Sequence, residues 1–254
     1  MKLGLLGKHL SHSYSPILHK LLMEEKGIIG TYSLFEISKE ELPLYVNKIR
    51  NKELDGFNVT IPYKKDIMPY LDEIDEAAKK IGAVNTVYLK DGLACGTNTD
   101  YYGFKDTLRI NNINVNNKVC YVLGTGGASL AVEHVILDLG GKVIKVSRNP
   151  LKGMISYQEL NQVEKPYLIV NTTPVGMYPD IDESPINKDV ARRSEHVIDI
   201  IFNPKTTKLL SYVDNKINGL WMLMAQGEKS EQIWFNKDYK LDLKDIFNKF
   251  KEMI

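Results

Sequence analysis

The sequence predicts an α/β fold of two domains: an N-terminal α/β domain, and a doubly wound, Rossmann-like nucleotide domain, with a cleft between them. Three observations predict this fold class. Apolar runs of strand length alternate with segments of helical period along the whole chain, which is typical of sheets built mostly from parallel strands. One continuous apolar run, 119–123, leads directly into a glycine-rich turn. The 254 residues, 43% of them hydrophobic, suffice for two modest cores.

The first domain is expected to span residues 1–102 and to bind the substrate. Its opening run, Met1–Gly7, reads as a buried strand, because it is too short for a signal peptide and lacks a small-residue cleavage site. The expected strands are Lys2–Gly7, Thr31–Glu36, Gly56–Thr60, Val84–Lys90 and Leu93–Gly96. The expected helices are Ser15–Lys26, Lys39–Asn51 and Asp75–Ile81, and a further expected helix, Tyr101–Ile110, crosses the boundary to the second domain.

The nucleotide domain is expected to span residues 103–236. Its expected strands are Lys118–Leu123, Lys142–Ser147, Leu168–Asn171, His196–Ile200 and, as a further candidate, Gly219–Trp221. Its expected helices are Ala128–Leu139, Thr206–Asn215 and Met222–Asn236. A last helix, Leu243–Met253 within the segment 237–254, has one apolar face. The sequence leaves open whether this helix packs on the nucleotide domain or returns to the first domain.

Composition excludes several classes of function. A formal net charge of +1 gives no global field that would favour nucleic acid or an acidic membrane. No apolar run approaches the roughly 20 residues of a membrane span. The two cysteines, Cys95 and Cys120, lie in separate strand-like runs, so we expect reduced, buried thiols in a cytoplasmic protein rather than a disulfide.

The glycine-rich turn after residue 123 is the first candidate site. Gly124 permits the tight turn, and Gly126 lets the backbone approach a pyrophosphate. The helix that starts near Ala128 points its free N–H groups at that anion. Ser129 replaces the third glycine of the usual motif and is still small. The expected cofactor contacts are Gly124, Thr125, Gly126, Gly127 and Ala128; the alternative is a strand–helix turn with incidental glycines.

The segment after the second nucleotide strand favours NADP over NAD. An acidic residue there would accept the ribose hydroxyls of NAD, but the chain has Ser147, Arg148 and Asn149, with Lys152 close behind. Arginine offers a planar fork that suits a 2′-phosphate. The alternative is a solvated surface arginine.

Lys64 and Asp100 are the candidate catalytic pair. Carbonyl reduction needs a hydride, which a nicotinamide cofactor provides, and a proton, which a side chain beside the developing alkoxide can provide. Lys64 is the candidate proton donor. Two alternatives remain: Lys64 stabilises the alkoxide without releasing its proton, or the two residues form a surface ion pair.

The motifs, in their order along the chain, resemble those of the shikimate dehydrogenase family. They are His12–Pro16, Asn58–Lys64, Gly82–Thr86, Asn98–Asp100, the glycine-rich turn, Asn171–Met177, Asp199–Pro204, Asn218–Leu220 and Gln226–Gly227. The resemblance covers nearly the whole chain. It implies an oxidoreductase of aromatic amino acid biosynthesis, in the branch to chorismate, that reduces 3-dehydroshikimate to shikimate with NADPH.

The resemblance also implies residue roles. Ser13 and Ser15 would bind the substrate carboxylate, although either could simply cap the helix that follows. The ring hydroxyls would contact Thr60, Asn85, Asp100 and Gln226, and the catalytic pair would be Lys64 and Asp100. Further cofactor contacts would come from Glu76, Thr172, Ile200 and Gly219.

Two departures from the family pattern stand out. Phe202 occupies a substrate-binding position where the family usually has tyrosine, and the lost hydroxyl would cost on the order of 1 kcal/mol of affinity if nothing replaces it. Ser147-Arg148-Asn149 replaces Asn-Arg-Thr, which keeps the arginine but changes its neighbours.

The sequence also bears on a possible metal site and on two rival functions. A metal site at His9, His12 and His19 lacks the partner spacing of a closed zinc site, so no metal is expected. The rival functions are a quinate/shikimate dehydrogenase that uses NAD or NADP and a non-catalytic metabolite-binding regulator. The expected partner is the small-molecule substrate, and the sequence does not distinguish a monomer from a homodimer.

Overall fold

The computed structural model describes residues 1–11 and 13–254. The chain divides into two compact units: unit 1 contains Met1–Gly103 and Leu223–Ile254, and unit 2 contains Phe104–Met222. The chain passes between the units inside two helices, α4 (Asp100–Ile110) and α8 (Leu220–Trp234). The C-terminal part of the chain, from residue 223 onward, therefore belongs to unit 1.

Unit 1 contains a six-stranded mixed sheet in the order β2-β1-β3-β5-β6-β4. The strands β1, β2 and β3 are parallel, whereas β5 runs antiparallel to both β3 and β6. Asp91 and Gly92, both with positive φ, form the two-residue turn between β5 and β6, as a tight hairpin requires. The strands are β1 (Lys2–Gly7), β2 (Thr31–Glu36), β3 (Gly56–Val59), β4 (Glu73–Ile74), β5 (Thr86–Lys90) and β6 (Leu93–Thr97).

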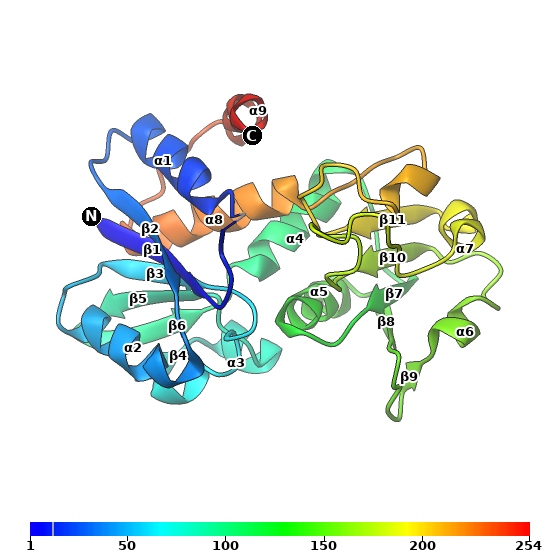
Figure 1. The fold of residues 1–254 in the computed structure, drawn as a ribbon, viewed down its shortest axis with the longest axis horizontal. Helices are drawn as coiled ribbons and strands as arrows, with labels where there is room; N and C mark the ends of the chain where they lie inside the picture. The colour runs from blue at the N-terminus through cyan, green and yellow to red at the C-terminus, as the bar shows by residue number, and fades with distance from the viewer. Residues whose placement is uncertain (12) are drawn as a thin grey trace. The chain divides into compact units, whose positions relative to one another are not determined.

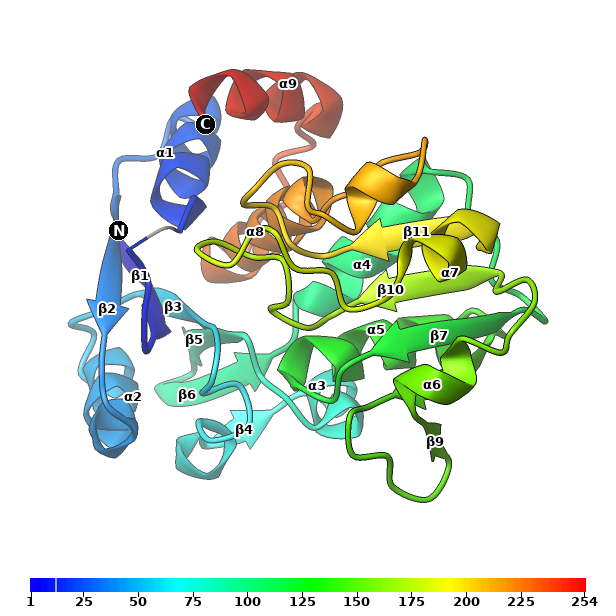
Figure 2. The same cartoon turned by 45° about the vertical axis from the view of Figure 1, so that its right-hand side comes forward.

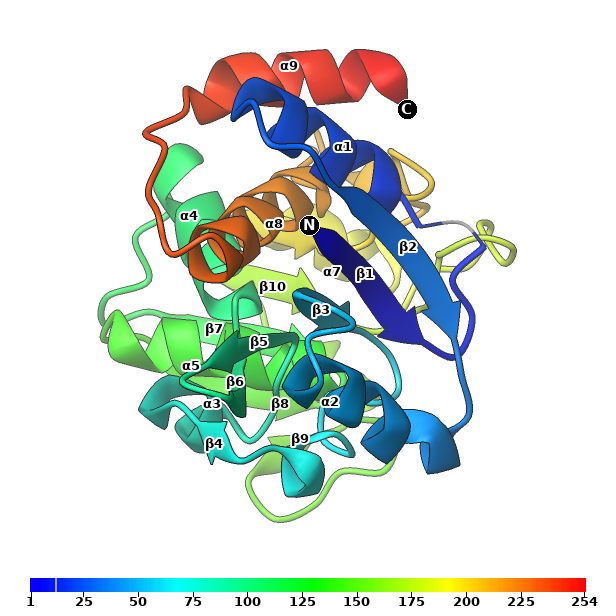
Figure 3. The ribbon, with the colours of Figure 1, turned by 90° about the vertical axis from the view of Figure 1, so that its left-hand side faces the viewer.

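Helices cover both faces of this sheet. The helices α1 and α8 lie on one face and α2 on the other (Figures 1 and 3). The core beneath α2 is built from Leu6, Val46, Ile49, Phe57 and Val87, all buried. The last helix, α9, packs on α1, where Lys249 lies 2.8 Å from Glu25. The helical segments are α1 (Ser15–Glu25), α2 (Leu42–Arg50), α3 (Glu76–Ile81), α9 (Leu243–Met253) and the 3₁₀ turns Lys39–Glu41 and Met68–Tyr70.

Unit 2 contains a five-stranded parallel sheet in the order β11-β10-β7-β8-β9. The chain starts in the centre at β7, moves outward through β8 and β9, and then returns to build β10 and β11 on the other side. This winding confirms the predicted doubly wound, Rossmann-like topology. The strands are β7 (Val119–Leu123), β8 (Lys142–Val146), β9 (Met154–Ile155), β10 (Leu168–Asn171) and β11 (His196–Asp199).

Helices also cover both faces of the second sheet. The helix α5 (Gly127–Asp138) lies on one face, and α6 (Tyr157–Leu160) and α7 (Lys188–Arg193) lie on the other (Figure 2). The core on the α6 and α7 side contains Leu123, Leu160, Ile169, Val190 and Val197. Among the described residues, no helix is both long and apolar enough to cross a membrane.

Two sequence-based expectations in unit 2 were wrong. The segment Thr206–Asn215 is not a helix but contains only a 3₁₀ turn, Leu210–Tyr212, because the chain must become extended at Val213 to bring Ile217 beside Ile198. The segment Gly219–Trp221 is not a strand, since α8 already begins at Leu220. The expectation of unpaired, buried cysteines is confirmed for Cys95 and Cys120.

Candidate active site

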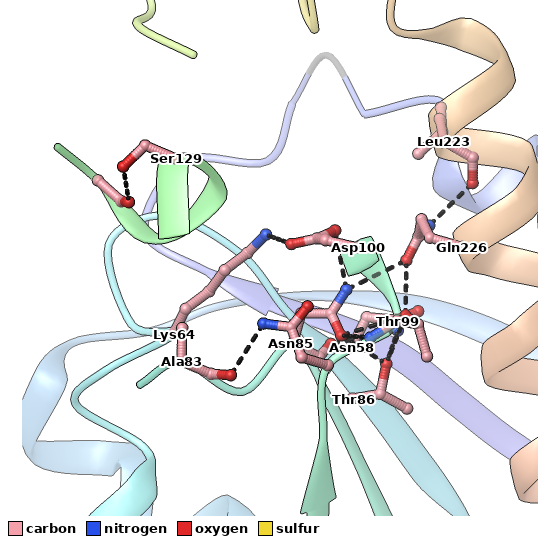
Figure 4. A network of polar contacts seen from close by, with 12 residues as sticks. Asn58, Lys64, Ala83, Asn85, Thr86, Thr99, Asp100, Ser129, Leu223 and Gln226 are labelled. Atoms are coloured by element: carbon pink, nitrogen blue, oxygen red, sulfur yellow. Dashed lines mark hydrogen bonds and ion pairs between the residues drawn. The ribbon is translucent and has the colours of Figure 1, made fainter. Parts of the chain in front are cut away.

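Lys64 and Asp100 meet in unit 1. Lys64 lies in the loop after β3, where its backbone carbonyl accepts a hydrogen bond from the N–H of Val84 at 2.8 Å. Asp100 is the first residue of α4. The Lys64 ammonium lies 2.5 Å from Asp100 Oδ2, and the two side chains are 12% and 9% exposed (Figure 4). The structure therefore forms the predicted pair in a site that water reaches only in part.

Asn85 and Gln226 extend this pair. The Asn85 Nδ2 group donates to Asp100 Oδ1 at 2.9 Å and to Gln226 Oε1 at 3.4 Å. Asn85 and Gln226 are both buried. Each oxygen of the Asp100 carboxylate thus has its own donor, Lys64 on one side and Asn85 on the other (Figure 4). Four of the predicted substrate-site residues lie together.

Several polar residues that the sequence did not single out support this cluster. The Thr99 backbone N–H donates to Asn85 Oδ1 at 2.6 Å, and the hydroxyls of Thr99 and Thr86 approach the same oxygen at 3.1 and 3.0 Å. Ser230, one helical turn after Gln226, contacts both threonines. Their positions next to the predicted site residues could have identified them: Thr86 follows Asn85, Thr99 precedes Asp100, and Ser230 lies four residues after Gln226.

Ser13, Ser15 and Thr60 lie beyond the carboxyl ends of β1 and β3, at one edge of the sheet. Ser15 begins α1 and is buried, and its N–H donates to Ser13 Oγ at 3.2 Å. Thr60 is half-buried and directly follows β3, and its N–H donates to Leu6 O at 2.9 Å. His12, part of the same motif as the two serines, lies outside the described residues. The structure thus places all three predicted residues at the edge where parallel strands commonly bind ligands.

The glycine-rich turn joins β7 to α5 in unit 2. Gly124 has φ +102°, a conformation that favours glycine, and a Cβ there would lie 3.1 Å from Thr172 Oγ1. The Thr172 N–H and hydroxyl both donate to Leu123 O, at 3.0 and 2.5 Å. The buried Ser129 hydroxyl donates to Gly126 O at 2.7 Å, so this residue fixes the turn from inside the helix.

Gly126 is a glycine that the fold itself does not need. Its φ of −76° is open to any residue, and a Cβ built there would meet no atom within 4 Å. Thr125 and Gly126 are exposed, and α5 begins at Gly127. The open space above this backbone and the free N–H groups of the helix fit the phosphates of a dinucleotide.

The predicted cofactor residues after β8 surround the end of that strand. The Asn149 N–H donates to Ser147 Oγ at 3.2 Å, and Arg148, Asn149 and Lys152 are exposed. Burial raises the pKa of the Tyr157 phenol, and the charge of Arg148 opposes that rise. The guanidinium therefore lies near Tyr157 on α6, at an accessible surface that can receive an anionic group.

Ile200 and Gly219 lie against each other. A Cβ on Gly219 would be 1.9 Å from Ile200 O, and the Gly219 N–H donates to Ile201 O at 3.1 Å. Ile200 and Phe202 are half-buried in the segment that follows β11. Only glycine allows the chain to pass so close to Ile200.

Asp199 ends β11 and is fully buried. Burial raises the pKa of its carboxyl from 3.8 to about 6, although donors from Thr207, Ile201 and Asn171 at 2.7, 3.1 and 3.0 Å partly oppose that rise. These contacts tie together the segments that carry Thr172 and Ile200.

The remaining candidates lie in unit 1. Glu76 is the exposed first residue of α3 and lies 3.2 Å from Lys79. His19 is buried, with its Nδ1 2.7 Å from Glu231. Over residues 1–11 and 13–254, no group of three or more His, Cys, Asp or Glu side chains is arranged to hold a metal ion.

Comparison with known proteins agrees with this geometry. Residues 5–87 match the family model of the shikimate dehydrogenase substrate binding domain. A curated shikimate dehydrogenase (NADP(+)) of Clostridium beijerinckii is 43% identical over 245 residues, which cover 91% of this chain and 90% of the relative.

Solved structures show the same similarity over the whole chain. Shikimate dehydrogenase 1 from Peptoclostridium difficile has a TM-score of 0.92 and 40% identity, covering 99% of this chain and 98% of that one. A shikimate 5-dehydrogenase from Thermus thermophilus, solved in complex with NADP(H) and shikimate, has a TM-score of 0.88 and 27% identity, with full coverage of both chains.

Proposed function

The chain belongs to the shikimate dehydrogenase family, and from this premise we propose that it catalyses the reversible, NADPH-dependent reduction of 3-dehydroshikimate to shikimate. This reaction is a step in chorismate and aromatic amino acid biosynthesis. The observation that carries the proposal is the Lys64–Asp100 contact of 2.5 Å, with Asn85 on the second carboxylate oxygen. A cation held in this way next to donors for a polyol is suited to carbonyl reduction.

Lys64 is the proposed proton donor and acceptor. When bound, NADPH supplies the hydride to the carbonyl carbon. The Lys64 ammonium donates its proton to the carbonyl oxygen and, in the reverse direction, the neutral amine takes the hydroxyl proton. Asp100 holds the ammonium in place, and the 12% exposure of Lys64 lets solvent restore its proton. In the alternative mechanism Lys64 keeps its proton and stabilises the alkoxide by charge alone.

The substrate would be oriented by the groups around this pair. Ser13 and Ser15, at the start of α1, would bind the carboxylate, because a helix N-terminus offers free N–H groups to an anion. Thr60, Asn85, Asp100 and Gln226 would bind the ring hydroxyls, which need both donors and acceptors. Phe202 would contribute an apolar surface without a hydroxyl.

The cofactor would be NADP(H), held mainly by unit 2. Gly124–Ala128 would hold the pyrophosphate, and Arg148 with Lys152 would bind the 2′-phosphate, flanked by Ser147 and Asn149. Thr172, Ile200 and Gly219 would line the nicotinamide, and Glu76 would contribute from unit 1. The support is the open backbone at Gly126 and the exposed arginine beside Tyr157.

Lys64→Ala tests the proposed role most simply. We expect kcat with shikimate and NADP to fall by roughly 10²–10⁴, with a smaller change in KM, as for a general acid–base group. Lys65→Ala is the matched control, since Lys65 is the exposed neighbour, and it should keep wild-type kcat. A Lys64→Ala enzyme with normal turnover would remove Lys64 from the mechanism.

The pH profile of wild-type kcat separates proton transfer from charge stabilisation. If Lys64 transfers the proton, kcat for shikimate oxidation should rise with pH as the neutral amine forms. If Lys64 acts by charge alone, kcat should fall over that range.

The rival functions make different demands. A quinate/shikimate dehydrogenase would turn over quinate, or use NAD, at comparable rates. A non-catalytic regulator would not need the Lys64–Asp100 pair, which is intact here. We propose further that the enzyme is cytoplasmic, in keeping with its two unpaired cysteines, and that it works as a monomer or homodimer. Light scattering of the purified protein distinguishes these two states.

A further inference from the structure

The side-chain amides of Asn85 and Gln226 belong to a buried chain of hydrogen bonds. In this chain the neighbours fix which group donates and which accepts. The amide of an asparagine can face two ways, and only its neighbours decide which end donates. At Asn85 the Thr99 backbone N–H, which can only donate, points at Oδ1 from 2.6 Å. The Nδ2 group is therefore turned to Asp100 Oδ1, which can only accept when the carboxylate is ionised.

Behind Asn85 lie three hydroxyl groups, those of Thr86, Thr99 and Ser230, which we call the hydroxyl triangle. Their oxygens are 3.0 Å from one another, and all three residues are fully buried. Each hydroxyl has a single proton to donate. The triangle reaches three outward acceptors: Asn85 Oδ1, Gln226 Oε1 and Gln226 O, at 3.0, 3.3 and 2.9 Å.

Asn58 provides the donors that allow the triangle to point outward. Its Nδ2 lies 3.0 Å from Thr86 Oγ1 (Figure 4). The same Nδ2 lies 2.9 Å from Ser230 Oγ. Since these two hydroxyls accept from Asn58, their own protons are free for the carbonyl oxygens of Asn85 and Gln226. If the Asn58 amide were reversed, both hydroxyls would donate to Asn58 instead, and Asn85 Oδ1 would lose a donor.

Tyr32 sets the orientation of Asn58. The Tyr32 hydroxyl donates to Asn58 Oδ1 at 2.8 Å, whereas the other contact that favours this orientation, from Nδ2 to Asn85 O, is longer at 3.3 Å. The Tyr32 ring stacks on His19, with centroids 4.0 Å apart and planes 8° apart. Burial and the charge of Glu231 raise the pKa of Tyr32 well above its usual value, so the phenol keeps its proton and remains a donor.

We propose that Tyr32 is a positioning residue for shikimate turnover: through Asn58 and the hydroxyl triangle, it fixes the direction of the hydrogen bonds that orient Asn85 and Gln226. This inference rests on the proposed function. It adds a residue of the edge strand β2 that acts without touching the reacting atoms.

Tyr32→Phe is the decisive variant, because it removes the donor to Asn58. It also removes the hydrogen bond between the phenol and the Ser15 side chain, so the double-mutant cycle with Asn85 assigns the effect to one of the two contacts. We expect kcat/KM for shikimate to fall by a factor on the order of 10, the usual effect of one buried hydrogen bond, with KM for NADP unchanged. Tyr63→Phe is the matched control: the buried Tyr63 hydroxyl donates to Ile37 O at 2.7 Å and lies outside the chain of bonds. This control should keep wild-type kinetics while losing comparable thermal stability.

A double-mutant cycle shows whether the effect passes through Asn85. In an Asn85→Ala background, Tyr32→Phe should cause a clearly smaller loss than in the wild type, because one of the two amides that it positions is gone. A Tyr32→Phe enzyme with the kinetics of Tyr63→Phe would overturn the proposal, and so would an equal loss in both backgrounds. Should Tyr32→Phe not fold, Thr86→Val interrupts the same chain and should show the same selective loss and the same dependence on Asn85.

A spectroscopic measurement separates this inference from the proposed function. The side-chain amide protons of Asn85 are identified by NMR from the signals lost in Asn85→Ala. They should shift and exchange faster with solvent in Tyr32→Phe than in Tyr63→Phe. Unchanged Asn85 signals would overturn the positioning role whether or not the wild type turns over shikimate. A wild type without shikimate turnover would contradict the proposed function instead.

Discussion

At the scale of single residues, Gly126 is a glycine that matters for the proposed cofactor binding but not for the stability of the fold. Because its φ is ordinary and a Cβ would meet no atom, Gly126→Ala should leave thermal stability nearly unchanged. We expect the dissociation constant for NADPH to rise by about 10-fold, because in the proposed site the added methyl group would stand where the pyrophosphate approaches the backbone. Protein fluorescence during an NADPH titration measures this constant.

The matched control for Gly126→Ala is Gly219→Ala. Its Cβ would lie 1.9 Å from Ile200 O, which is backbone and cannot move away alone. This variant should lose stability as well as cofactor affinity. If Gly126→Ala bound NADPH like the wild type, the glycine-rich turn would not be the pyrophosphate site.

Asp199 predicts a pH dependence of stability. Its pKa is raised from 3.8 to about 6 by burial, so between these pH values the folded protein binds more protons than the unfolded chain. The contribution of Asp199 to the free energy of unfolding is therefore complete below about pH 4 and is lost as the pH rises through about 6. The shift corresponds to about 3 kcal/mol.

Asp199→Asn should remove this dependence. An asparagine of the same shape can still accept from Asn171 and Ile201 and can donate to the Thr207 hydroxyl, which would turn its proton away. Urea unfolding from pH 4 to pH 7 should show the variant gaining up to about 3 kcal/mol relative to the wild type. The exposed Asp180→Asn should show no such trend. A difference between Asp199→Asn and wild type that does not vary with pH would contradict the assignment.

At the scale of elements, a buried ionic cluster joins α1 to α8. The Lys26 ammonium contacts both Glu228 and Glu231, and Glu231 also contacts His19. The side chains of Lys26, Glu231 and His19 are fully buried. Burial raises the pKa of Glu228, and Lys26 opposes that rise. Lys26 therefore neutralises carboxylates that water cannot reach.

Lys26→Met should destabilise unit 1 strongly. Removing one partner of a buried ion pair leaves the other charge uncompensated, which costs about 3–5 kcal/mol. Lys249→Met is the control, because Lys249 pairs with Glu25 and Asp245 at 46% exposure and should lose at most about 1 kcal/mol. Urea unfolding of both variants measures the difference, and equal losses would contradict the role of the cluster.

Helices and strands could be predicted from the sequence where their own apolar pattern is long enough to identify them. The strand Lys2–Gly7, the strand Thr31–Glu36 and the helix Leu243–Met253 have the bounds expected from their apolar pattern. The strand β9 and the helix α6, of two and four residues, are too short to leave a periodic signal. A local signal for α6 did exist, since Ser156 and Glu159 form a capping box.

Some residues of the candidate site could likewise be predicted from the sequence, and others could not. Lys64 and Asp100 could be proposed from sequence because their chemistry and their motifs are visible in it, and the structure brings them together. Tyr32 and Ser230 could not, because their importance comes from contacts across 26 residues to Asn58 and 144 residues to Thr86. Such contacts depend on the tertiary structure, and they cannot be read from a single sequence.

At the scale of the whole molecule, each unit contains one half of the proposed chemistry. Unit 1 contains Lys64, Asp100, Asn85 and Gln226, and unit 2 contains the glycine-rich turn. Gln226 belongs to unit 1 although it is far along the chain, because α8 returns there after unit 2 is complete. The two ends of the chain thus build unit 1 with the proposed substrate site, and the middle builds unit 2.

The most direct test of this account is the initial rate of cofactor reduction at 340 nm by the wild-type protein. Shikimate and quinate are each paired with NADP and with NAD. The account predicts rapid turnover with shikimate and NADP, and much slower turnover with quinate or with NAD. Comparable rates with quinate or NAD would place the protein among dual-specificity quinate/shikimate dehydrogenases. A folded protein that turns over none of the four pairs would contradict the enzymatic assignment.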